Sequence, residues 1–590
     1  MGNLDESVSE AWQHHTAGRW FEAAAACRRI LGEAPDDPRA QHLLGVIACR
    51  HGNYEAAIAW LGKAAARPES TAEWHDDLGL AYSGAGRLDD AAASHRRALA
   101  LWPDRAAAHH RLGKVLRAQG KSSAALASLR QAVALAPECP EAHFDLGNSL
   151  AVLGDRTAAA ACYRAALQHN PDYAEAYTNL GLMLFERGEF AEAAICYRDA
   201  LARDPNSAIA HNNLGNACER RGDLEAATAA FERAVTLDPS YVAPRINLGN
   251  VILERGDPAT AIACYESAIR LAPEQAEAHR NYGLVRLMLG DLPGGWAQWR
   301  WPAGGPQRFA QPEWRGERLH GATILLYAEQ GFGDILHFVR YVPLVAARGG
   351  RVILEVPAEL RRFLTDMPGA AQILTCGETL PDFDWQCSLL SLPLAFGTEL
   401  STIPAQVPYI PVPETAPPIQ LAGSSAGGLR VGLVWAGRPE HNRDRHRSLP
   451  LPVLAPLWQV PEVAFYALQK GRGADEIAAH SAAMPLIDLG SSLADFTDTA
   501  AAIAALDLVI TVDTSVAHLA GALGRPVWIL LSAIPDWRWL LDRCDSPWYP
   551  SARLFRQATA GDWEPVVEEV AAALAALPAG QAGDAGAALD

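Results

Sequence analysis

Glycine recurs every 34 residues through the first half of this 590-residue chain, as the step from Gly45 to Gly79 shows. The first series consists of Gly45, Gly79, Gly113, Gly147, Gly181, Gly215, Gly249 and Gly283. A second series keeps the same step from Gly18 to Gly290, and alanine follows it five places later, as at Ala23. Proline closes most units, for example at Pro137. A fixed period of this length predicts stacked copies of one small structural unit.

The period and its small residues predict tetratricopeptide repeats, which are helix–turn–helix units. The first glycine lets two helices approach closely, the second occupies the turn between them, and proline ends the second helix. Eight full units fit residues 4–275, and a ninth begins at 276 and runs into "GGWAQWRW". We therefore expect residues 1–301 to form an α-solenoid, a superhelix whose inner groove is lined by the first helix of each unit.

Asparagine occupies one slot in four consecutive units, two residues before the first glycine. These residues are Asn179, Asn213, Asn247 and Asn281. Because an amide both donates and accepts hydrogen bonds, such a column can bind the backbone of an extended protein segment. Alternatively, the asparagines cap or solvate the helices. Earlier units hold Asp77, Arg111 and Asp145 in this slot, so the expected ladder is confined to the later units.

The periodicity changes after a connection rich in Pro, Gly and Trp at residues 302–321. "TILLYAEQGFGDILHFVRYVPLVAARGGRVILEV" predicts a strand, a glycine turn, a helix and a second strand. After a linker-like stretch at 411–428, "LRVGLVWAG", "VAFYALQKG", "DLVITVD" and "RPVWILLS" predict a second α/β set. Apolar strands alternating with helices indicate parallel, doubly wound sheets. We expect two Rossmann-like domains, at 322–420 and 429–575, followed by a disordered tail at 576–590.

Charge and composition exclude several classes of protein. The net charge of −18 argues against a nucleic-acid-binding surface. The opening "MGNLDESVSEAWQHH" is polar, so we expect neither a signal peptide nor a membrane span. The ten cysteines include no CxxC pair, which is typical of reduced thiols. We expect a cytoplasmic protein.

Three segments that follow predicted strands are expected to meet at the carboxyl edges of the sheets, where ligands bind in such folds. The first is "EQGFGDILH", in which Gly331 and Gly333 free the backbone and Asp334 stands at the start of a helix. A carboxylate at this place is suited to accept a proton from an attacking hydroxyl. Alternatively, Asp334 caps the helix.

The second segment, "WAGRPEHNRDRHRSLPL" at 435–451, carries four arginines: Arg438, Arg443, Arg445 and Arg447. Guanidinium groups bind phosphate oxygens and can neutralise a departing diphosphate. Alternatively, this is a solvated loop whose charge is partly offset by Glu440 and Asp444. Lys470 in "ALQKGRG" follows another strand and can add a point charge to the same phosphate.

The third segment is "VITVDTSVAHLAGALGRPVWIL" at 509–530. A helix that begins near Thr514 offers free N–H groups and a positive dipole to an anion, and Thr514 and Ser515 add hydroxyl donors. We expect His518 to face the cleft and donate to a phosphate or sugar oxygen. Asp513 can accept from sugar hydroxyls or hold a neighbouring loop. Alternatively, Asp513 is the N-cap and His518 a core histidine.

Five stretches together resemble a known family: "GFGDILHFVRYVPL", "GLVWAGRPEHNRDRHRSLPL", "LQKGRG", "VDTSVAHLAGALGRPVW" and "PDWRWLLDRCDSPWYPSARLFRQ". They resemble the bacterial tetratricopeptide–glycosyltransferase proteins, whose catalytic half is similar to heptosyltransferases of glycosyltransferase family 9. The domain order resembles protein O-GlcNAc transferases and repeat-bearing flagellin glycosyltransferases. The resemblance covers nearly the whole chain and is most specific at 509–563.

The resemblance implies a GT-B fold and an inverting, metal-independent reaction with no cofactor beyond a nucleotide-sugar cosubstrate. It places the acceptor in the lobe at 322–420 and the nucleotide sugar in the lobe at 429–575. It implies Asp334 as the base, Asp513 and His518 at the donor diphosphate, and a basic side chain such as Arg447 or Lys470 beside them. The heptosyltransferases carry a lysine where this chain has Arg445-His446-Arg447, so the residue that substitutes for it stays open.

The expected function is therefore sugar transfer from a nucleotide sugar to a hydroxyl. The expected acceptor is Ser or Thr of a protein, such as a flagellin, held in the repeat groove. One alternative is a transferase that builds a glycan or a lipid-linked saccharide. Another is an inactive protein-binding scaffold. A homo-oligomer is compatible with each of these.

Overall fold

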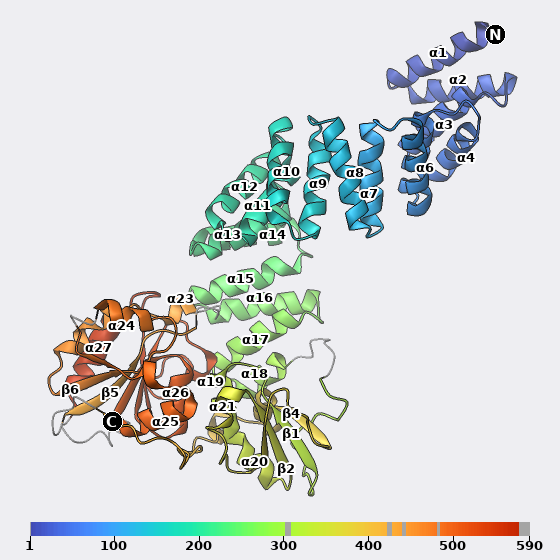
Figure 1. Ribbon diagram of the computed structural model, residues 1–590. Helices are drawn as coiled ribbons and strands as arrows, with labels where there is room; N and C mark the ends of the chain where they lie inside the picture. The colour runs from blue at the N-terminus through green and yellow to red at the C-terminus, as the bar shows by residue number, and fades with distance from the viewer. Residues whose placement is uncertain (1, 301–307, 422–427, 439–443, 481–483, 578–590) are drawn as a thin grey trace. The chain divides into compact units, whose positions relative to one another are not determined.

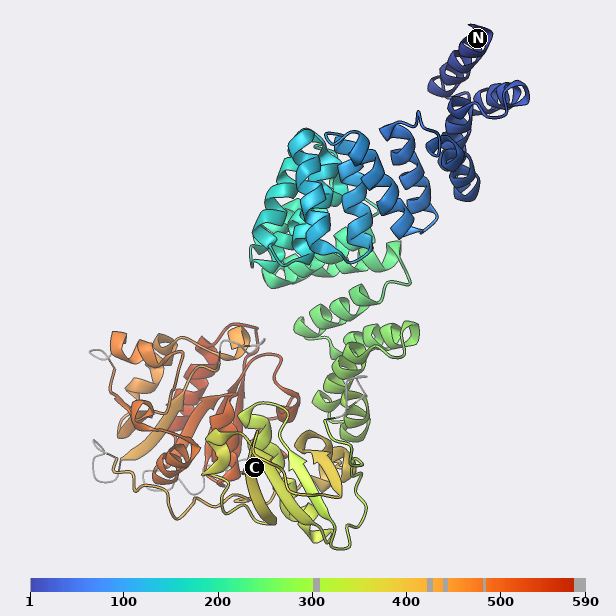
Figure 2. The ribbon, with the colours of Figure 1, turned by 45° about the vertical axis from the view of Figure 1, so that its right-hand side comes forward.

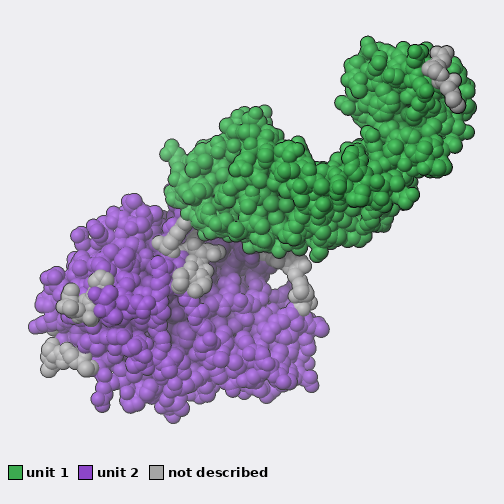
Figure 3. All heavy atoms as spheres, turned by 45° about the horizontal axis from the view of Figure 1, so that its top comes forward, with its two compact units in different colours: residues 1–244 green, residues 245–590 purple. Residues whose placement is uncertain are grey.

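The computed structural model describes residues 2–300, 308–421, 428–438, 444–480 and 484–577. The chain divides into two compact units, unit 1 at residues 1–244 and unit 2 at residues 245–590 (Figure 3). Part of the expected connection, up to residue 307, and the expected tail from residue 578 lie outside the described residues.

Helices make up the first half of the chain, as the repeat pattern predicts (Figure 1). They are α1 (Gly2–Thr16), α2 (Trp20–Glu33), α3 (Pro38–Arg50), α4 (Tyr54–Ala65), α5 (Ala72–Gly84), α6 (Leu88–Leu101), α7 (Ala106–Ala118), α8 (Ser122–Leu135), α9 (Pro140–Val152), α10 (Arg156–His169), α11 (Ala174–Glu186), α12 (Phe190–Arg203), α13 (Ala208–Arg220), α14 (Leu224–Leu237), α15 (Val242–Glu254), α16 (Pro258–Leu271), α17 (Ala276–Met288) and α18 (Leu292–Trp299). The α-solenoid is therefore confirmed, and the ninth unit ends with the short helix α18.

The two glycine series have the roles that the sequence predicts. A Cβ on Gly215 would lie 2.5 Å from the Phe231 ring, and one on Gly181 would lie 2.6 Å from Tyr197, so only glycine lets paired helices touch here. The second series has φ between +73° and +88° in the turns, where a side chain would strain the backbone. The 34-residue period thus encodes helix contact and turn geometry.

The last repeats pack directly on the α/β part of unit 2. Trp296 of α18 is fully buried, and its ring centroid lies 4.8 Å from Trp537 and 6.0 Å from Phe338. Arg300 donates to Glu329 at 2.8 Å. The compact units consequently divide at 244/245, inside the repeats, whereas the sequence suggested a domain boundary at 301/302. Glycine and proline spacing carries no information about this aromatic contact.

The first lobe of unit 2, residues 308–421, contains a parallel sheet, drawn in yellow-green to yellow in Figure 2. Its strands lie in the order β3-β2-β1-β4. Its strands are β1 (Thr323–Tyr327), β2 (Arg351–Val356), β3 (Ala370–Thr375) and β4 (Trp385–Ser388). Its helices are α19 (Phe332–Phe338), η1 (Val339–Tyr341), α20 (Val342–Ala347), α21 (Ala358–Arg361), η2 (Leu389–Ser391), α22 (Leu392–Ala395) and η3 (Leu400–Thr402).

The second lobe, residues 428–577, contains a parallel sheet in the order β10-β9-β8-β5-β6-β7. Its strands are β5 (Leu429–Val434), β6 (Val463–Ala467), β7 (Leu486–Asp488), β8 (Leu508–Val512), β9 (Val527–Leu531) and β10 (Ala552–Arg556). Its helices are α23 (Asp444–Arg447), η4 (Leu451–Gln459), α24 (Ala474–His480), η5 (Gly490–Ser492), α25 (Phe496–Ala505), α26 (Ser515–Ala522), η6 (Trp537–Trp539) and α27 (Glu564–Ala575).

Counted from β5, the second sheet has the doubly wound order 3-2-1-4-5-6. Its strand order reverses between β5 and β8, and such a switch point is where doubly wound sheets bind ligands. Buried Trp435, Trp528 and Trp563 belong to the core of this lobe. The predicted α/β second half is confirmed. Within the described residues, no helix is both long enough and apolar enough to span a membrane.

Candidate functional site

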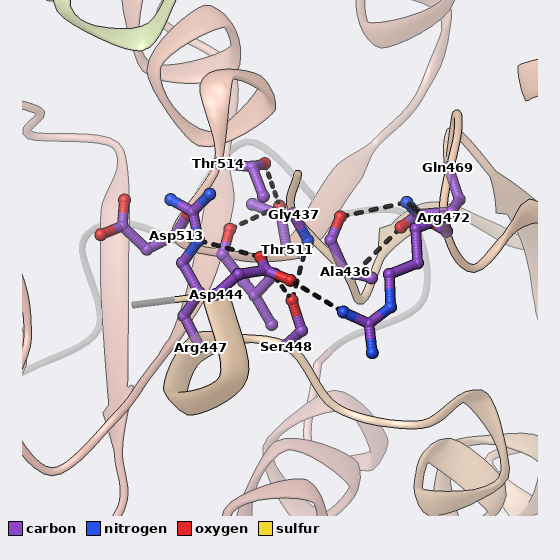
Figure 4. Close-up of polar contacts among 11 residues, drawn as sticks. Ala436, Gly437, Asp444, Arg447, Ser448, Gln469, Arg472, Thr511, Asp513 and Thr514 are labelled. Atoms are coloured by element: carbon purple, nitrogen blue, oxygen red, sulfur yellow. Dashed lines mark hydrogen bonds and ion pairs between the residues drawn. The ribbon is translucent and has the colours of Figure 1, made fainter. Parts of the chain in front are cut away.

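Loops that follow β5, β6 and β8 converge at the switch point of the second sheet (Figure 4). Parallel strands end at one edge of a sheet, so the polar residues after them gather there. Figure 4 shows Arg447 and Asp444 of α23 beside Asp513 and Thr514. The second and third segments singled out in the sequence therefore meet at this edge.

Arg447 is fixed against the turn between β8 and α26. Its Nη1 donates to the main-chain oxygen of Asp513 at 3.0 Å, and its Nε lies 3.4 Å from a carboxylate oxygen of Asp444. Asp444 is only 2% exposed, and it also accepts from Ser448 at 2.9 Å. A buried acid thus orients the arginine at the mouth of the turn.

Thr514 caps the helix that begins at Ser515. Its hydroxyl accepts from the main-chain N–H of Val516 at 3.3 Å, so the alternative that Asp513 is the N-cap is wrong. The first N–H groups of a helix lack partners within the helix and attract anions. With Arg447 beside it, this turn combines a guanidinium group, a helix N-terminus and a hydroxyl.

Asp513 directly follows β8, and its side chain is 17% exposed. Burial raises the pKa of its carboxyl group to about 6, and the negative charge of Asp536 adds to this, whereas Arg447 opposes it. The carboxyl group therefore changes charge near neutral pH. It can accept from, or donate to, a sugar hydroxyl at this edge.

Asp334 lies in the first turn of α19, whose N-cap is Gly331. A hydrogen bond from the Gly331 backbone lowers the pKa of Asp334, which agrees with the alternative that this side chain caps the helix. Its carboxylate forms an ion pair with Arg538 of η6, in the second lobe. Burial raises the pKa of Asp334 above its usual range; Arg538 opposes this rise and Asp536 adds to it. The candidate base is thus tied to the opposite lobe.

Gly333 brings α19 against α26. A Cβ on Gly333 would lie 2.8 Å from Cδ2 of His518 and 3.7 Å from Cα of Ser515. The glycine therefore allows two helices to pack closely. The helix that carries Asp334 consequently lies on the helix that begins beside Thr514.

His518 lies in the core, with 5% of its surface exposed. Its Nδ1 is 2.9 Å from the Tyr549 hydroxyl, and its ring stacks on Trp539 at 5.4 Å. Burial lowers the pKa of His518 well below its usual value, and nearby Arg538 adds to this. The side chain does not face an open cleft as the sequence suggested, because Gly333 and Trp539 cover it.

The other predicted basic residues lie apart from this turn. The Lys470 ammonium donates to the main-chain oxygen of Leu493, and the exposed Arg438 lies 4.7 Å over the Phe332 ring. A contact of Lys470 with the same phosphate therefore stays a prediction. Arg443 and the side chain of Arg445 lie outside the described residues.

Sequence reasoning missed Gln469 and assigned no role to Arg538. Gln469 is buried; its side-chain oxygen accepts from the N–H groups of Trp435 and Ala436 at 3.1 and 3.0 Å. It joins the loops after β5 and β6. The sequence signal for Gln469 was a glutamine two residues after an apolar strand and two residues before Gly471. The signal for Arg538 was the run "PDWRW".

The asparagine slot makes contacts within the repeats. In unit 1, Asn179 donates to Asn148 at 2.9 Å, and the Tyr163 hydroxyl donates to the same oxygen at 2.8 Å. The Asn213 oxygen lies 3.4 Å from the Asn212 amide. In earlier units the charged slot residue Asp77 pairs with His42 at 2.9 Å.

Unit 2 repeats this arrangement. Asn281 donates to Asn250 at 2.9 Å, and the Tyr265 hydroxyl donates to Asn250 at 2.8 Å. Asn247 lies half-buried on α15. The amides of Asn179 and Asn281 therefore connect neighbouring repeats, and peptide binding by the slot stays a prediction. Within the described ranges, no group of three His, Cys, Asp or Glu residues is placed to hold a metal ion.

Models of known protein families match stretches in both halves of the chain. Tetratricopeptide-repeat families match residues 15–76, 77–138, 110–155, 144–198, 187–242 and 246–296. Glycosyltransferase family 9 (heptosyltransferase) matches residues 470–555, which include Asp513, Thr514, His518 and Arg538. This chain joins tetratricopeptide repeats to a glycosyltransferase family 9 domain. The family 9 match supports glycosyltransferase activity.

Several individual proteins are similar to parts of the chain. Protein FlbA of Caulobacter vibrioides is 29% identical over 297 residues, which are 45% of this chain and 49% of that protein. The chain thus spans about half the length of this curated relative. The APC/C hetero-tetramer Cut9-Hcn1 has a TM-score of 0.35 at 16% identity, covering 45% of this chain and 52% of that one. MamA has a TM-score of 0.27 at 26% identity, covering 28% and 95%.

Proposed function

We propose that the chain is a GT-B glycosyltransferase that moves a sugar from a nucleotide-sugar donor to a hydroxyl group. One observation carries the proposal. Arg447 and the N-terminus of α26 meet at the switch point of a 3-2-1-4-5-6 sheet, with Thr514 and Ser515 between them. A guanidinium group, helix N–H groups and hydroxyls are complementary to a diphosphate.

The proposed reaction is a single displacement. The acceptor oxygen bonds to the anomeric carbon while the bond from that carbon to the diphosphate oxygen breaks, which inverts the anomeric configuration. Asp334 takes the proton of the acceptor hydroxyl. Arg447 and the α26 dipole stabilise the negative charge on the departing diphosphate, so the reaction needs no metal ion.

Asp513 and His518 have different parts in this proposal. Asp513, partly exposed at the edge, contacts sugar or ribose hydroxyls. His518 supports the turn from the core through Tyr549. Lys470 and Arg445 add positive charge to the same diphosphate in this proposal.

The proposed acceptor is a Ser or Thr hydroxyl of a cytoplasmic protein held by the repeats. Tetratricopeptide repeats mostly bind protein segments, and the domain order resembles repeat-bearing flagellin glycosyltransferases. The half-buried Asn179, Asn213, Asn247 and Asn281 offer amide groups to such a segment. A flagellin is therefore the first acceptor to test.

The donor is tested first by a thermal-shift screen of UDP-, GDP-, CMP- and dTDP-sugars. A ligand at a hundred times its dissociation constant adds about 2.7 kcal/mol of stability. Asp334→Asn should keep the shift while transfer to flagellin falls about 100-fold or more, since general-base catalysis contributes roughly that much. Asp545→Asn, an exposed acid paired with Arg543, is the matched control and should transfer normally. Undiminished transfer by Asp334→Asn would exclude it as the base.

A further inference from the structure

Arg538 lies between two carboxylates that come from different lobes. Its Nη1 donates to Asp536 at 2.7 Å, within the second lobe. Its Nη2 donates to Asp334, on α19 of the first lobe. The guanidinium group itself is buried. One arginine therefore joins the candidate base to the loop after β9.

The surroundings hold Arg538 in place. Its guanidinium carbon lies 4.4 Å over the Trp537 ring and 5.5 Å over Phe338, which belongs to α19. Arg556 of β10 donates to the main-chain oxygens of Trp539 and Leu540 at 2.6 and 3.1 Å. The loop that carries Arg538 is thus fastened to the sheet. Among the described residues, Arg538 Nε is buried without a partner, so only the two Nη groups bind acids.

Two charged groups at η6, Arg538 and Asp536, act on the Asp334 carboxylate. The charge of Arg538 also acts on His337 of α19 and His518 of α26, and Asp513 after β8 acts on Arg538. Burial lowers the pKa of both histidines, so they are neutral near pH 7. Arg340 is bound to the main-chain oxygens of His337 and Trp548. Only Arg538 contacts Asp334 directly with a positive charge among the described residues.

We propose that Arg538 is a positioning residue for sugar transfer, which fixes the Asp334 carboxylate across the two lobes through a direct ion pair. This inference rests on the proposed function. Asp536 has the opposite electrostatic effect, because its negative charge disfavours ionisation of Asp334. Replacement of Arg538 and of Asp536 should therefore shift the pH dependence of transfer in opposite directions.

The full-length protein is assayed for transfer to flagellin, with the nucleotide sugar that gives the largest thermal shift, between pH 5 and 9. Arg538→Met should lower kcat at least about tenfold with the donor KM changed less than about threefold, the pattern of a lost transition-state interaction. The pH at which its transfer rate falls on the acidic side of the profile (the acidic limb) should move to higher pH, because Asp334 then protonates more easily. Arg538→Lys should restore part of kcat and of the shift.

Asp536→Asn should move the acidic limb to lower pH. Arg543→Gln removes a half-exposed arginine of the same segment that pairs with Asp545, and its pH profile should match that of the parent. If both charge variants move the limb in one direction, or neither moves it, the proposal is wrong. If Arg538→Met folds poorly, Arg538→Lys takes its place, and its acidic limb should still move opposite to that of Asp536→Asn.

Hydrogen exchange of α19 separates this inference from the proposed function. Arg538→Met should raise amide exchange in residues 332–338, whereas Arg543→Gln should not. If no nucleotide sugar is bound or turned over, the proposed function fails. If amide exchange in residues 332–338 is then also unchanged by Arg538→Met, the inference that Arg538 holds α19 to the second lobe is rejected as well. If amide exchange in α19 increases but the acidic limb of the pH profile does not move, Arg538 is a purely structural residue, and its proposed role in sugar transfer is wrong.

Discussion

Asp513 shows how a single residue acquires its chemistry from its surroundings. Its position after an apolar strand is visible in the sequence, but its raised pKa comes from burial and from Asp536, which lies 23 positions later. Arg447 approaches from a third segment and binds its main-chain oxygen. The ionisation of this carboxyl group is therefore a tertiary property.

Asp513→Asn should stabilise the protein at neutral and alkaline pH. The folded pKa of about 6 lies above the unfolded value, so the folded state binds the proton more tightly and stability falls as pH rises between the two values. The variant should gain at most about 3 kcal/mol above pH 7, and almost nothing below pH 4, from a shift of about two units. Tm measured from pH 3 to 8 checks this, and a gain that does not depend on pH would contradict it.

At the level of elements, the contact between α19 and α26 brings the helix that carries Asp334 against the helix that begins beside Thr514. Sequence patterns predicted both helices and placed Asp334 and Thr514 at their starts. From the sequence we interpreted Gly331 and Gly333 as residues that free the backbone. In the structure, Gly333 is the contact surface between the helices, and the Tyr549 hydroxyl lies 2.9 Å from Nδ1 of His337 on α19 and from that of His518 on α26.

Gly333→Ala should therefore disturb the packing of these helices. Its Cβ would lie 2.8 Å from His518, so we expect a destabilisation of about 1–3 kcal/mol, the usual cost of overpacking a core. Gly331→Ala is the matched control, because its Cβ would meet only Asp334 Oδ2, at 3.7 Å. Urea unfolding of both variants distinguishes them. Equal stability of the two would show that the helix contact tolerates a methyl group.

At the scale of the whole molecule, the last repeat packs into the core of the α/β lobes and is not a separate domain from them. Trp296, Phe338 and Trp537 bring a repeat and both lobes of unit 2 into one aromatic cluster. Its central ring, Trp296, is fully buried. A repeat helix is thus part of the core that supports Arg538 and α19.

A fragment of residues 245–590 should fold cooperatively, whereas one of residues 308–590 should not. The shorter fragment loses Trp296 and leaves Phe338 and Trp537 uncovered. In the full chain, Trp296→Ala should cost about 3–5 kcal/mol, as for other fully buried large aromatic side chains. Calorimetry and binding of a hydrophobic dye compare the fragments. A cooperative transition in the shorter one, without dye binding, would show that the α/β lobes are independent of the repeats.

The local pattern of residues determined the elements of this protein. Glycine at 34-residue intervals specifies helix contacts and turns, and apolar runs ended by Asp513 or followed by Gly331 specify strands and the helices after them. These features depend on neighbours within one repeat or one strand–helix unit, so a linear sequence contains them.

Only the tertiary structure decided which of these residues meet. Arg447 reaches Asp513, Arg538 reaches Asp334, and His518 is enclosed in the core. Each contact joins segments whose order along the sheet is set by strand pairing and by close packing between lobes. Burial and charge act through space, so the roles of these side chains follow from which segments the fold brings together.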